Sequence, residues 1–365
     1  MRFAVVLVTF LASGFLAAPA HAGDPALTSL TPPTIAGQAV FGRKLKVTAG
    51  TWDQAGVVTT FQWQRDGKDI AGATTSGYRI ARADIGHRLG VIATGILEGF
   101  TDGTSVSDLT AKVTPATITV TKRVAIGGSL RFRHVARAKP ATWSVKPANV
   151  RYQWLRNGTA IKGATTKRYT IAVPDVGAKL TVRATATKPG YRAKASTSKA
   201  KTGRHLRALK RTFTYVVTTR GHLTAGLAQF AKQAQQTYDD PRGWRSAGYA
   251  FKRVERGGDF TLVLSQASQV PTFGYPCSST YSCRVGRYVI INQDRWLRTT
   301  PVWKKSGLGR RNYRHLVVNH ETGHWLGHRH EYCGGRGQLA PVMQQQSKGL
   351  QGCKANPWPL PHERW

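Results

Sequence analysis

The chain has 365 residues and a formal net charge of +37, with 54 lysines and arginines against 17 acidic residues. That length is too great for one ordinary domain and sufficient for two or three, each with its own core. The positive charge is spread along the chain and favours salt-dependent contact with anionic envelope polymers. A specific nucleic-acid partner is not expected, because neither a recognised binding motif nor a basic stripe with interleaved aromatic residues occurs.

The first 22 residues have the pattern of an export signal. Arg2 supplies positive charge, residues 3–18 are almost continuously apolar, and Ala20-His21-Ala22 places small residues at a cleavage site. We expect cleavage after Ala22 and a secreted or cell-surface protein. An uncleaved anchor is the alternative. The run is short for a membrane span, however, and no later segment approaches about 18 uninterrupted apolar residues, so no transmembrane anchor is expected.

Residues 23–115 and 116–198 are predicted to be two copies of one repeat of about 90 residues. Short alternating runs are separated by turn formers such as Asp66-Gly67, which is typical of a hairpin-rich sandwich. The copies resemble the immunoglobulin-like repeats of exported bacterial surface proteins, without the cysteine pair that joins the sheets of antibody domains. Their role stays open between a spacer and a glycan-binding or envelope-binding module. The aligned positions are Phe61-Gln-Trp63 with Tyr152-Gln-Trp154, Trp52 with Trp143, Tyr78 with Tyr169, and Asp84 with Asp175.

Residues 199–211 are basic and lack strand alternation, which predicts a linker. From residue 212 to residue 365 the pattern mixes strands with helices and indicates an α/β domain. Strands are expected around Phe213–Val217, Tyr249–Phe251, Phe260–Leu264 and Tyr288–Asn292, and helices along residues 223–238 and 312–326.

All four cysteines lie in this last domain. An even number of cysteines in an exported protein favours disulfides over free thiols. Three pairings are possible, and local spacing favours Cys277 with Cys283 and Cys333 with Cys353. A zinc site made of the four cysteines is the alternative, but neither pair has CxxC spacing.

The second predicted helix carries the residues that indicate chemistry. His320 and His324 are four residues apart, so both imidazoles project from one face. Gly327 suits a helix-ending turn that would return the chain and deliver His330 as a third ligand. Three histidines leave a position open, as in catalytic zinc sites, whereas structural sites are closed by four ligands. We therefore expect one Zn²⁺ per chain, with Glu321 as general base.

This HExxHxxGxxH pattern, followed by a methionine at Ala340-Pro-Val-Met343, resembles the metzincin zinc peptidases, which have a methionine turn beneath the metal. Met343 is the candidate. Residues 340–346 and 352–358 are also similar to exported actinobacterial proteins of unknown function that are usually predicted to be metzincins. The resemblance implies a metzincin-like fold with an edge strand above the cleft, for which residues 259–265 are the candidate. The astacin signature does not continue beyond Glu331.

The sequence thus predicts a secreted zinc endopeptidase with a peptide or protein substrate. A bridge between Cys333 and Cys353 would restrain the loop that presents His330. The alternative is a surface glycan-binding or envelope-binding protein whose metal domain is not catalytic. Tyr332, two residues after His330, is a weaker candidate for stabilising an oxyanion.

Overall fold

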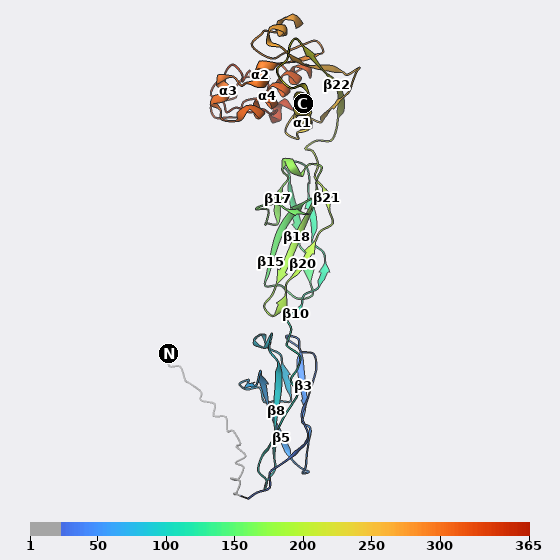
Figure 1. Cartoon of the computed structure of the whole chain (residues 1–365), viewed down its shortest axis with the longest axis vertical. Coiled ribbons are helices and arrows are strands. Elements are labelled where there is room, and N and C mark those ends of the chain that lie inside the picture. The colour runs from blue at the N-terminus through green and yellow to red at the C-terminus, as the bar shows by residue number, and fades with distance from the viewer. Residues whose placement is uncertain (1–22) are drawn as a thin grey trace, which may run out of the picture. The chain divides into compact units, whose positions relative to one another are not determined.

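The computed structural model describes residues 23–365, so the expected signal peptide at residues 1–22 lies outside the described part (Figure 1). The chain is multidomain and built mostly from β-sheet. Within residues 23–365, no helix combines the length and the apolar character needed to cross a membrane.

The first repeat contains a three-stranded sheet, β2-β3-β7, and a four-stranded sheet, β6-β5-β8-β9. Leu45 of β3 and Trp63 of β5 come from different sheets and are fully buried in one core, which makes the repeat a sandwich. Asp66 and Gly67 both have positive φ in the tight turn between β5 and β6, as hairpins require. The strands are β1 Ser29–Thr31, β2 Thr34–Ala36, β3 Lys44–Thr48, β4 Thr51–Trp52, β5 Val58–Arg65, β6 Lys68–Asp69, β7 Gly77–Arg79, β8 Leu89–Ile96 and β9 Gly103–Val106, with the 3-10 turn η1 Arg82–Asp84.

The second repeat has the corresponding sheets, β12-β13-β17 and β16-β15-β18-β20. Trp154 is fully buried in β15, as Trp63 is in β5. The prediction of two all-β repeats is confirmed at the level of their sheets. The strands are β10 Ala116–Thr117, β11 Val120–Lys122, β12 Ala125–Gly128, β13 Val135–Lys139, β14 Thr142–Trp143, β15 Asn149–Arg156, β16 Thr159–Ala160, β17 Arg168–Thr170, β18 Lys179–Thr187, β19 Tyr191–Arg192, β20 Lys194–Thr197 and β21 Lys201–Thr202, with the 3-10 turn η2 Val173–Asp175.

The segment predicted as a linker, residues 199–211, is more ordered than expected. Its strand β21 pairs with β18, and Arg211 is the first residue of the next domain's longest strand. Backbone pairing needs no alternation when the side chains of a strand are exposed, and both residues of β21 are exposed. The lack of alternation was therefore a poor guide here.

The C-terminal domain is organised around one five-stranded sheet in the order β23-β22-β24-β26-β25. The pairings among β22, β23, β24 and β26 are parallel, and β25 pairs antiparallel with β26 at one edge. The elements are β22 Arg211–Arg220, α1 Leu227–Asp239, η3 Trp244–Ala247, β23 Tyr249–Arg253, β24 Phe260–Ser265, η4 Ala267–Phe273, β25 Cys283–Val285, β26 Tyr288–Asn292, α2 Gln293–Leu297, α3 Pro301–Lys305, α4 Gly309–Trp325 and η5 Pro361–Glu363.

The position of residues 259–265 corrects the expectation of an edge strand. β24 lies between β22 and β26, and all six of its residues are buried. A continuous apolar run is typical of a central strand in a parallel sheet, so the sequence pattern favours the observed place. The strand at the edge of the sheet next to β26 is β25.

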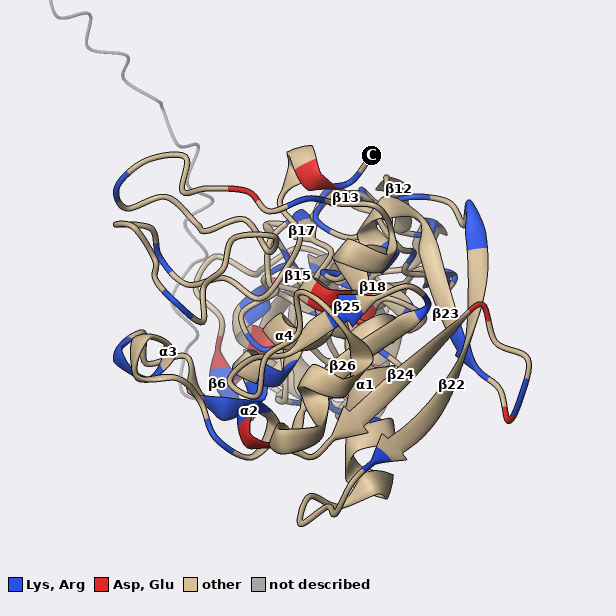
Figure 2. Ribbon diagram, turned by 90° about the horizontal axis from the view of Figure 1, so that it is seen from above, with Lys and Arg blue, Asp and Glu red and all other residues tan. Residues whose placement is uncertain are grey.

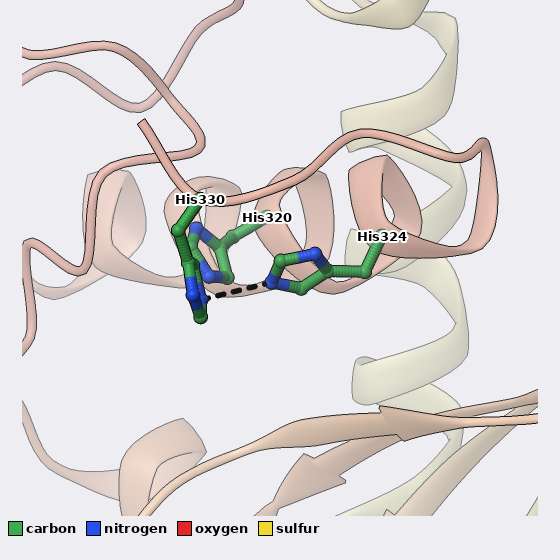
Figure 3. A group of neighbouring side chains, drawn as sticks. All are labelled: His320, His324 and His330. Carbon is green, nitrogen blue, oxygen red and sulfur yellow. Dashed lines mark hydrogen bonds between the residues drawn. The ribbon is translucent and has the colours of Figure 1, made fainter. Parts of the chain in front are cut away.

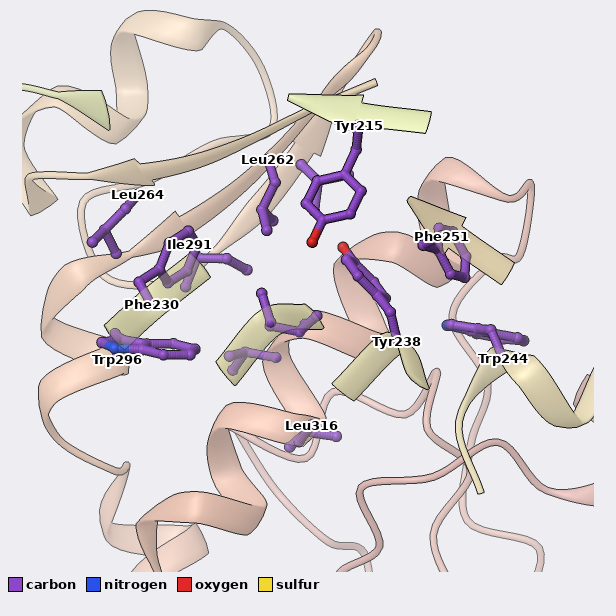
Figure 4. Packing of buried hydrophobic residues seen from close by; sticks show 14 of the residues in the cluster. Tyr215, Phe230, Tyr238, Trp244, Phe251, Leu262, Leu264, Ile291, Trp296 and Leu316 are labelled. Carbon is purple, nitrogen blue, oxygen red and sulfur yellow. The ribbon is translucent and has the colours of Figure 1, made fainter. Parts of the chain in front are cut away.

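A large aromatic core joins this sheet to helices α1 and α4 (Figure 4). Tyr215 of β22 and Tyr238 of α1 meet edge to face with ring centroids 5.1 Å apart, and Leu316 packs into the same core from α4. Burial of aromatic rings contributes strongly to core stability. This packing holds α4, and with it the predicted metal ligands, against a rigid support.

Candidate metal centre

Helix α4 and the chain that follows it bring the three predicted histidine ligands together (Figure 3). His320 and His324 project from one face of the helix, one turn apart. Gly327 has a φ of 100°, in the left-handed region that favours glycine, and the chain turns back there. His330 thereby faces the other two rings, and one ligand atom from each of the three lies within 4.8 Å of the others.

Backbone carbonyl groups orient two of the rings. His320 Nδ1 lies 2.8 Å from the carbonyl oxygen of Val342, and His324 Nδ1 lies 2.9 Å from that of His328. A carbonyl oxygen only accepts, so these hydrogen bonds place the protons on Nδ1 and leave the Nε2 lone pairs facing the centre. Metal-ligating histidines are held in this way in known sites.

The geometry fits zinc. His324 Nε2 and His330 Nε2 are 3.1 Å apart. Two nitrogens that bind one tetrahedral Zn²⁺ at about 2.0–2.1 Å are separated by about 3.3 Å. The three described ligands therefore converge closely enough for one ion, with a donor set of neutral nitrogens that zinc accepts readily.

The electrostatics keep the rings neutral, which is the form that binds metal. Burial lowers the pKa of His320 to about 3, and the neighbouring charge of His324 adds to the effect. Burial also lowers the pKa of His324 and of His330. Neutral imidazoles of this kind could accept a cation without first losing protons.

Glu321 follows the first ligand and is only 6% exposed. It lines a cleft of about 580 Å³ together with the three histidines. Burial raises its pKa to about 8. Within residues 23–365 it forms no salt bridge, since the ion pairs there involve other carboxylates. A carboxyl group poised near neutrality can take up and return a proton.

Met343 packs beneath the ligand-bearing helix, where the methionine turn was predicted. Its side chain is fully buried, and its sulfur lies against Gly323, between His320 and His324 in the sequence. A Cβ atom at position 323 would overlap that sulfur and come within 2.7 Å of the Trp244 ring. Gly323 is thus required for the close approach of this turn to the helix.

Glu363 fixes the methionine turn and was not predicted as part of the site. Its buried carboxylate accepts hydrogen bonds from the backbone N–H groups of Val342 at 3.0 Å, Met343 at 2.8 Å and Leu360 at 2.6 Å. Burial raises its pKa, and these three bonds oppose the rise. Because the Val342 carbonyl holds His320, Glu363 supports a ligand through one residue. The signal in the sequence was an isolated glutamate in a chain with few acids.

Two disulfides brace the surrounding loops, and the predicted pairings are confirmed. Cys277 bonds to Cys283, and Cys333 bonds to Cys353 across a separation of 20 residues. The second bridge begins just after His330 and ends beyond the methionine turn. It therefore anchors the chain three residues after His330 to the segment that follows the methionine turn.

Two other residues near the ligands have different environments. His328 is buried between Trp244 and Trp365, with ring centroids 4.6 and 4.2 Å away, so it supports the site through packing and its carbonyl group. Tyr332 is 76% exposed and does not line the cleft. The structure therefore gives no support to Tyr332 as an oxyanion-stabilising group.

Residues 183–361 match the family described as "Protein of unknown function (DUF3152)". This segment includes the three histidines, Glu321 and Met343, and the family description states no activity. A search of the curated proteins finds no match.

Three solved structures illustrate the likeness to immunoglobulin-domain proteins. An amphioxus IgVJ-C2 molecule is 13% identical, with 44% of this chain and 96% of that chain covered and a TM-score of 0.24. Three domains of the bacteriophage RB49 outer capsid protein Hoc are 15% identical, with 48% and 69% covered and a TM-score of 0.20. The tandem Ig repeats of Dlar are 12% identical, with 46% and 96% covered and a TM-score of 0.17. At such scores, the sandwich assignment depends on the strands and cores described above.

Proposed function

We propose that this protein is a secreted zinc-dependent endopeptidase of the metzincin type. His320, His324 and His330 would hold one Zn²⁺, and Glu321 would act as general base. The observation that carries the proposal is the convergence of three oriented imidazoles beside a buried, unpaired carboxyl group in an open cleft. Two disulfides favour an extracellular location.

Zinc in such a site supplies a Lewis acid that polarises a carbonyl group and acidifies water. Glu321 would take a proton from the attacking water and return it to the leaving amine. Its position supports this role, because Glu321 lines the cleft beside the three histidines and no ion pair within residues 23–365 engages its carboxylate. His320 and His324 stay in one tautomer through their carbonyl partners and need no reorganisation during the reaction.

The edge strand β25 favours a peptide as substrate. Cys283 and Arg284 of this strand line the same cleft as the histidines. An extended peptide can add to an exposed sheet edge through backbone hydrogen bonds, which would bring a scissile bond alongside the metal ligands. The metzincin resemblance implies a sheet with an edge strand above the cleft. The five-stranded sheet, with β25 at its antiparallel edge, is consistent with that implication.

The test combines metal analysis with peptide-library cleavage by the full secreted chain. We expect about one zinc per chain and cleavage within peptides. A chelator should remove both the bound zinc and the cleavage activity. Glu321→Gln should keep the zinc and lower kcat about 100-fold to 10,000-fold. Glu255→Gln, a change at an exposed carboxylate, is the matched control and should leave activity unchanged.

Unchanged activity in Glu321→Gln would reject the proposed base. A chain that holds zinc without cleaving any peptide, yet binds envelope glycans, would favour the binding-protein alternative instead.

A further inference from the structure

Charged residues in the cleft are almost all of one sign. Glu321 is its single acidic lining residue. Four cationic residues line it as well: Arg284, Arg295, Arg329 and Lys348. Blue Lys and Arg segments are also more widespread than red Asp and Glu segments in this view of the chain (Figure 2). Inside the cleft, the imbalance lies beside the three histidines.

Within the described residues, no acidic side chain forms an ion pair with these four cations. The Nε atoms of Arg284 and Arg295 are buried and make no hydrogen bond in the described part of the chain. A buried guanidinium donor without an acceptor is costly unless a ligand completes it.

The cations come from separate elements that line the same cleft as the histidines. Arg284 belongs to the edge strand β25, Arg295 to helix α2, and Lys348 to the loop after the methionine turn. Lys348 Nζ lies 5.4 Å from the centre of the Tyr281 ring, which also lines the cleft. Much of the remaining lining is uncharged and polar, including Ser278, Ser282, Gln344 and Ser347. Hydroxyl and amide groups of this kind can donate hydrogen bonds to a bound carboxylate.

We propose that the cleft selects acidic peptides, with Arg284, Arg295 and Lys348 as specificity-determining residues that receive the carboxylates of substrate residues near the scissile bond. This inference rests on the proposed peptidase function. Guanidinium groups match carboxylates in geometry and form their strongest hydrogen bonds with them, and the low-dielectric wall strengthens the attraction. Peptides are favoured over nucleic acids because the cleft borders a sheet edge that can pair with a peptide backbone.

The binding test uses the zinc-loaded Glu321→Gln chain, so that binding is measured without cleavage. A capped alanine heptapeptide with one central glutamate is compared by calorimetry with versions that carry glutamine or lysine there. We expect the glutamate peptide to bind about tenfold more tightly than the glutamine peptide, and the lysine peptide most weakly. Raising the salt concentration should narrow the difference between glutamate and lysine.

Charge-changing variants then assign the preference to the cleft. Arg295→Gln should lower the preference for glutamate several-fold, and the exposed Arg298→Gln, outside the cleft, should leave it unchanged. Lys348 is exposed, so Lys348→Glu should preserve the fold. This change should reduce or invert the ratio of the binding affinities for the glutamate and lysine peptides. This second variant keeps the test decisive if Arg295→Gln folds poorly.

Equal binding of the three peptides would overturn the inference, even if the wild-type chain cleaves all of them and the peptidase proposal stands. If the chain binds the glutamate peptide preferentially but the wild type cleaves none of the peptides, the peptidase function would be rejected, and the cleft would instead be a binding site for acidic ligands. An oligonucleotide that binds more tightly than the glutamate peptide and depends on Arg295 would overturn the choice of a peptide.

Discussion

Buried carboxylates occur in the repeats and in the C-terminal domain, and their partners differ. In the first repeat, Asp84 is fully buried and binds the Arg65 guanidinium, the Tyr78 hydroxyl and the Ala81 N–H group. In the second repeat, Asp175 repeats the arrangement with Arg156, Tyr169 and Ala172. Glu321 lines a cleft, and among residues 23–365 it has no ion-pair partner of this kind.

The comparison separates a structural acid from a candidate catalytic one. A buried carboxylate whose oxygens are all satisfied holds loops in place and is not available to a substrate. A buried carboxyl group without partners is unfavourable for stability, and such groups cluster at functional sites. Glu363 lies between these extremes, since backbone N–H groups satisfy it but no cation does.

The largest effect on stability is expected at the paired aspartates. Asp84→Ala leaves Arg65 and Tyr78 without their acceptor and should lower the free energy of unfolding by about 3–4 kcal/mol. Asp175→Ala should act similarly in the second repeat, and neither should change zinc content. Chemical denaturation and metal analysis measure both. Asp69→Ala, at an exposed residue, is the control; an equal loss there would contradict the structural role.

Removal of the bridge between Cys333 and Cys353 tests whether anchoring the chain just after His330 helps to hold the third histidine in place. The double change to serine opens a loop of 20 residues and should destabilise the C-terminal domain by about 3 kcal/mol. Zinc affinity should fall too, because His330 loses its restraint. Chelator competition measures the affinity. The same double change at Cys277 and Cys283, six residues apart, should weaken zinc binding less.

Glu363→Gln tests whether a satisfied carboxylate supports the site at a distance. Loss of the charge weakens hydrogen bonds to the methionine turn and should lower the free energy of unfolding by about 2 kcal/mol. Zinc affinity should fall about tenfold, as for other partners of ligating residues. Unchanged affinity, with Glu255→Gln as the exposed control, would limit Glu363 to a structural role.

The smallest effect concerns alkaline pH. Burial, and then the hydrogen bond to the aspartate, raises the pKa of Tyr78 and of Tyr169 to about 12. The folded state therefore holds these protons more tightly than the unfolded state, in which tyrosine titrates near pH 10. The contribution is present below pH 10 and is lost as the pH rises to 12. Tyr78→Phe should show a shallower fall in stability across that interval, measured by denaturation at each pH; an unchanged slope would contradict it.

Most of the candidate site can be predicted from the sequence, because the positions of its histidines follow from helical periodicity and a helix-ending turn. Helical periodicity places His320 and His324 on one face, and Gly327 suits the turn that returns His330. The disulfide pairing can also be predicted from spacing, because each cysteine bonds to its nearest cysteine along the chain. Residues 259–265 precede the helix, as an edge strand above the cleft would, but their continuous apolar run is typical of the centre of a sheet, where the structure places them.

The sequence by itself determined the two β repeats, the helix with its metal-binding pattern and the cysteine pairs, because each depends on periodicity or short spacing. Only the tertiary structure decided that Glu363 holds the methionine turn, that β25 is the edge beside the cleft, and that Arg284, Arg295 and Lys348 line the cleft of the histidines. No periodicity or motif in the sequence encodes these contacts, because they depend on how the whole domain packs its strands and loops together.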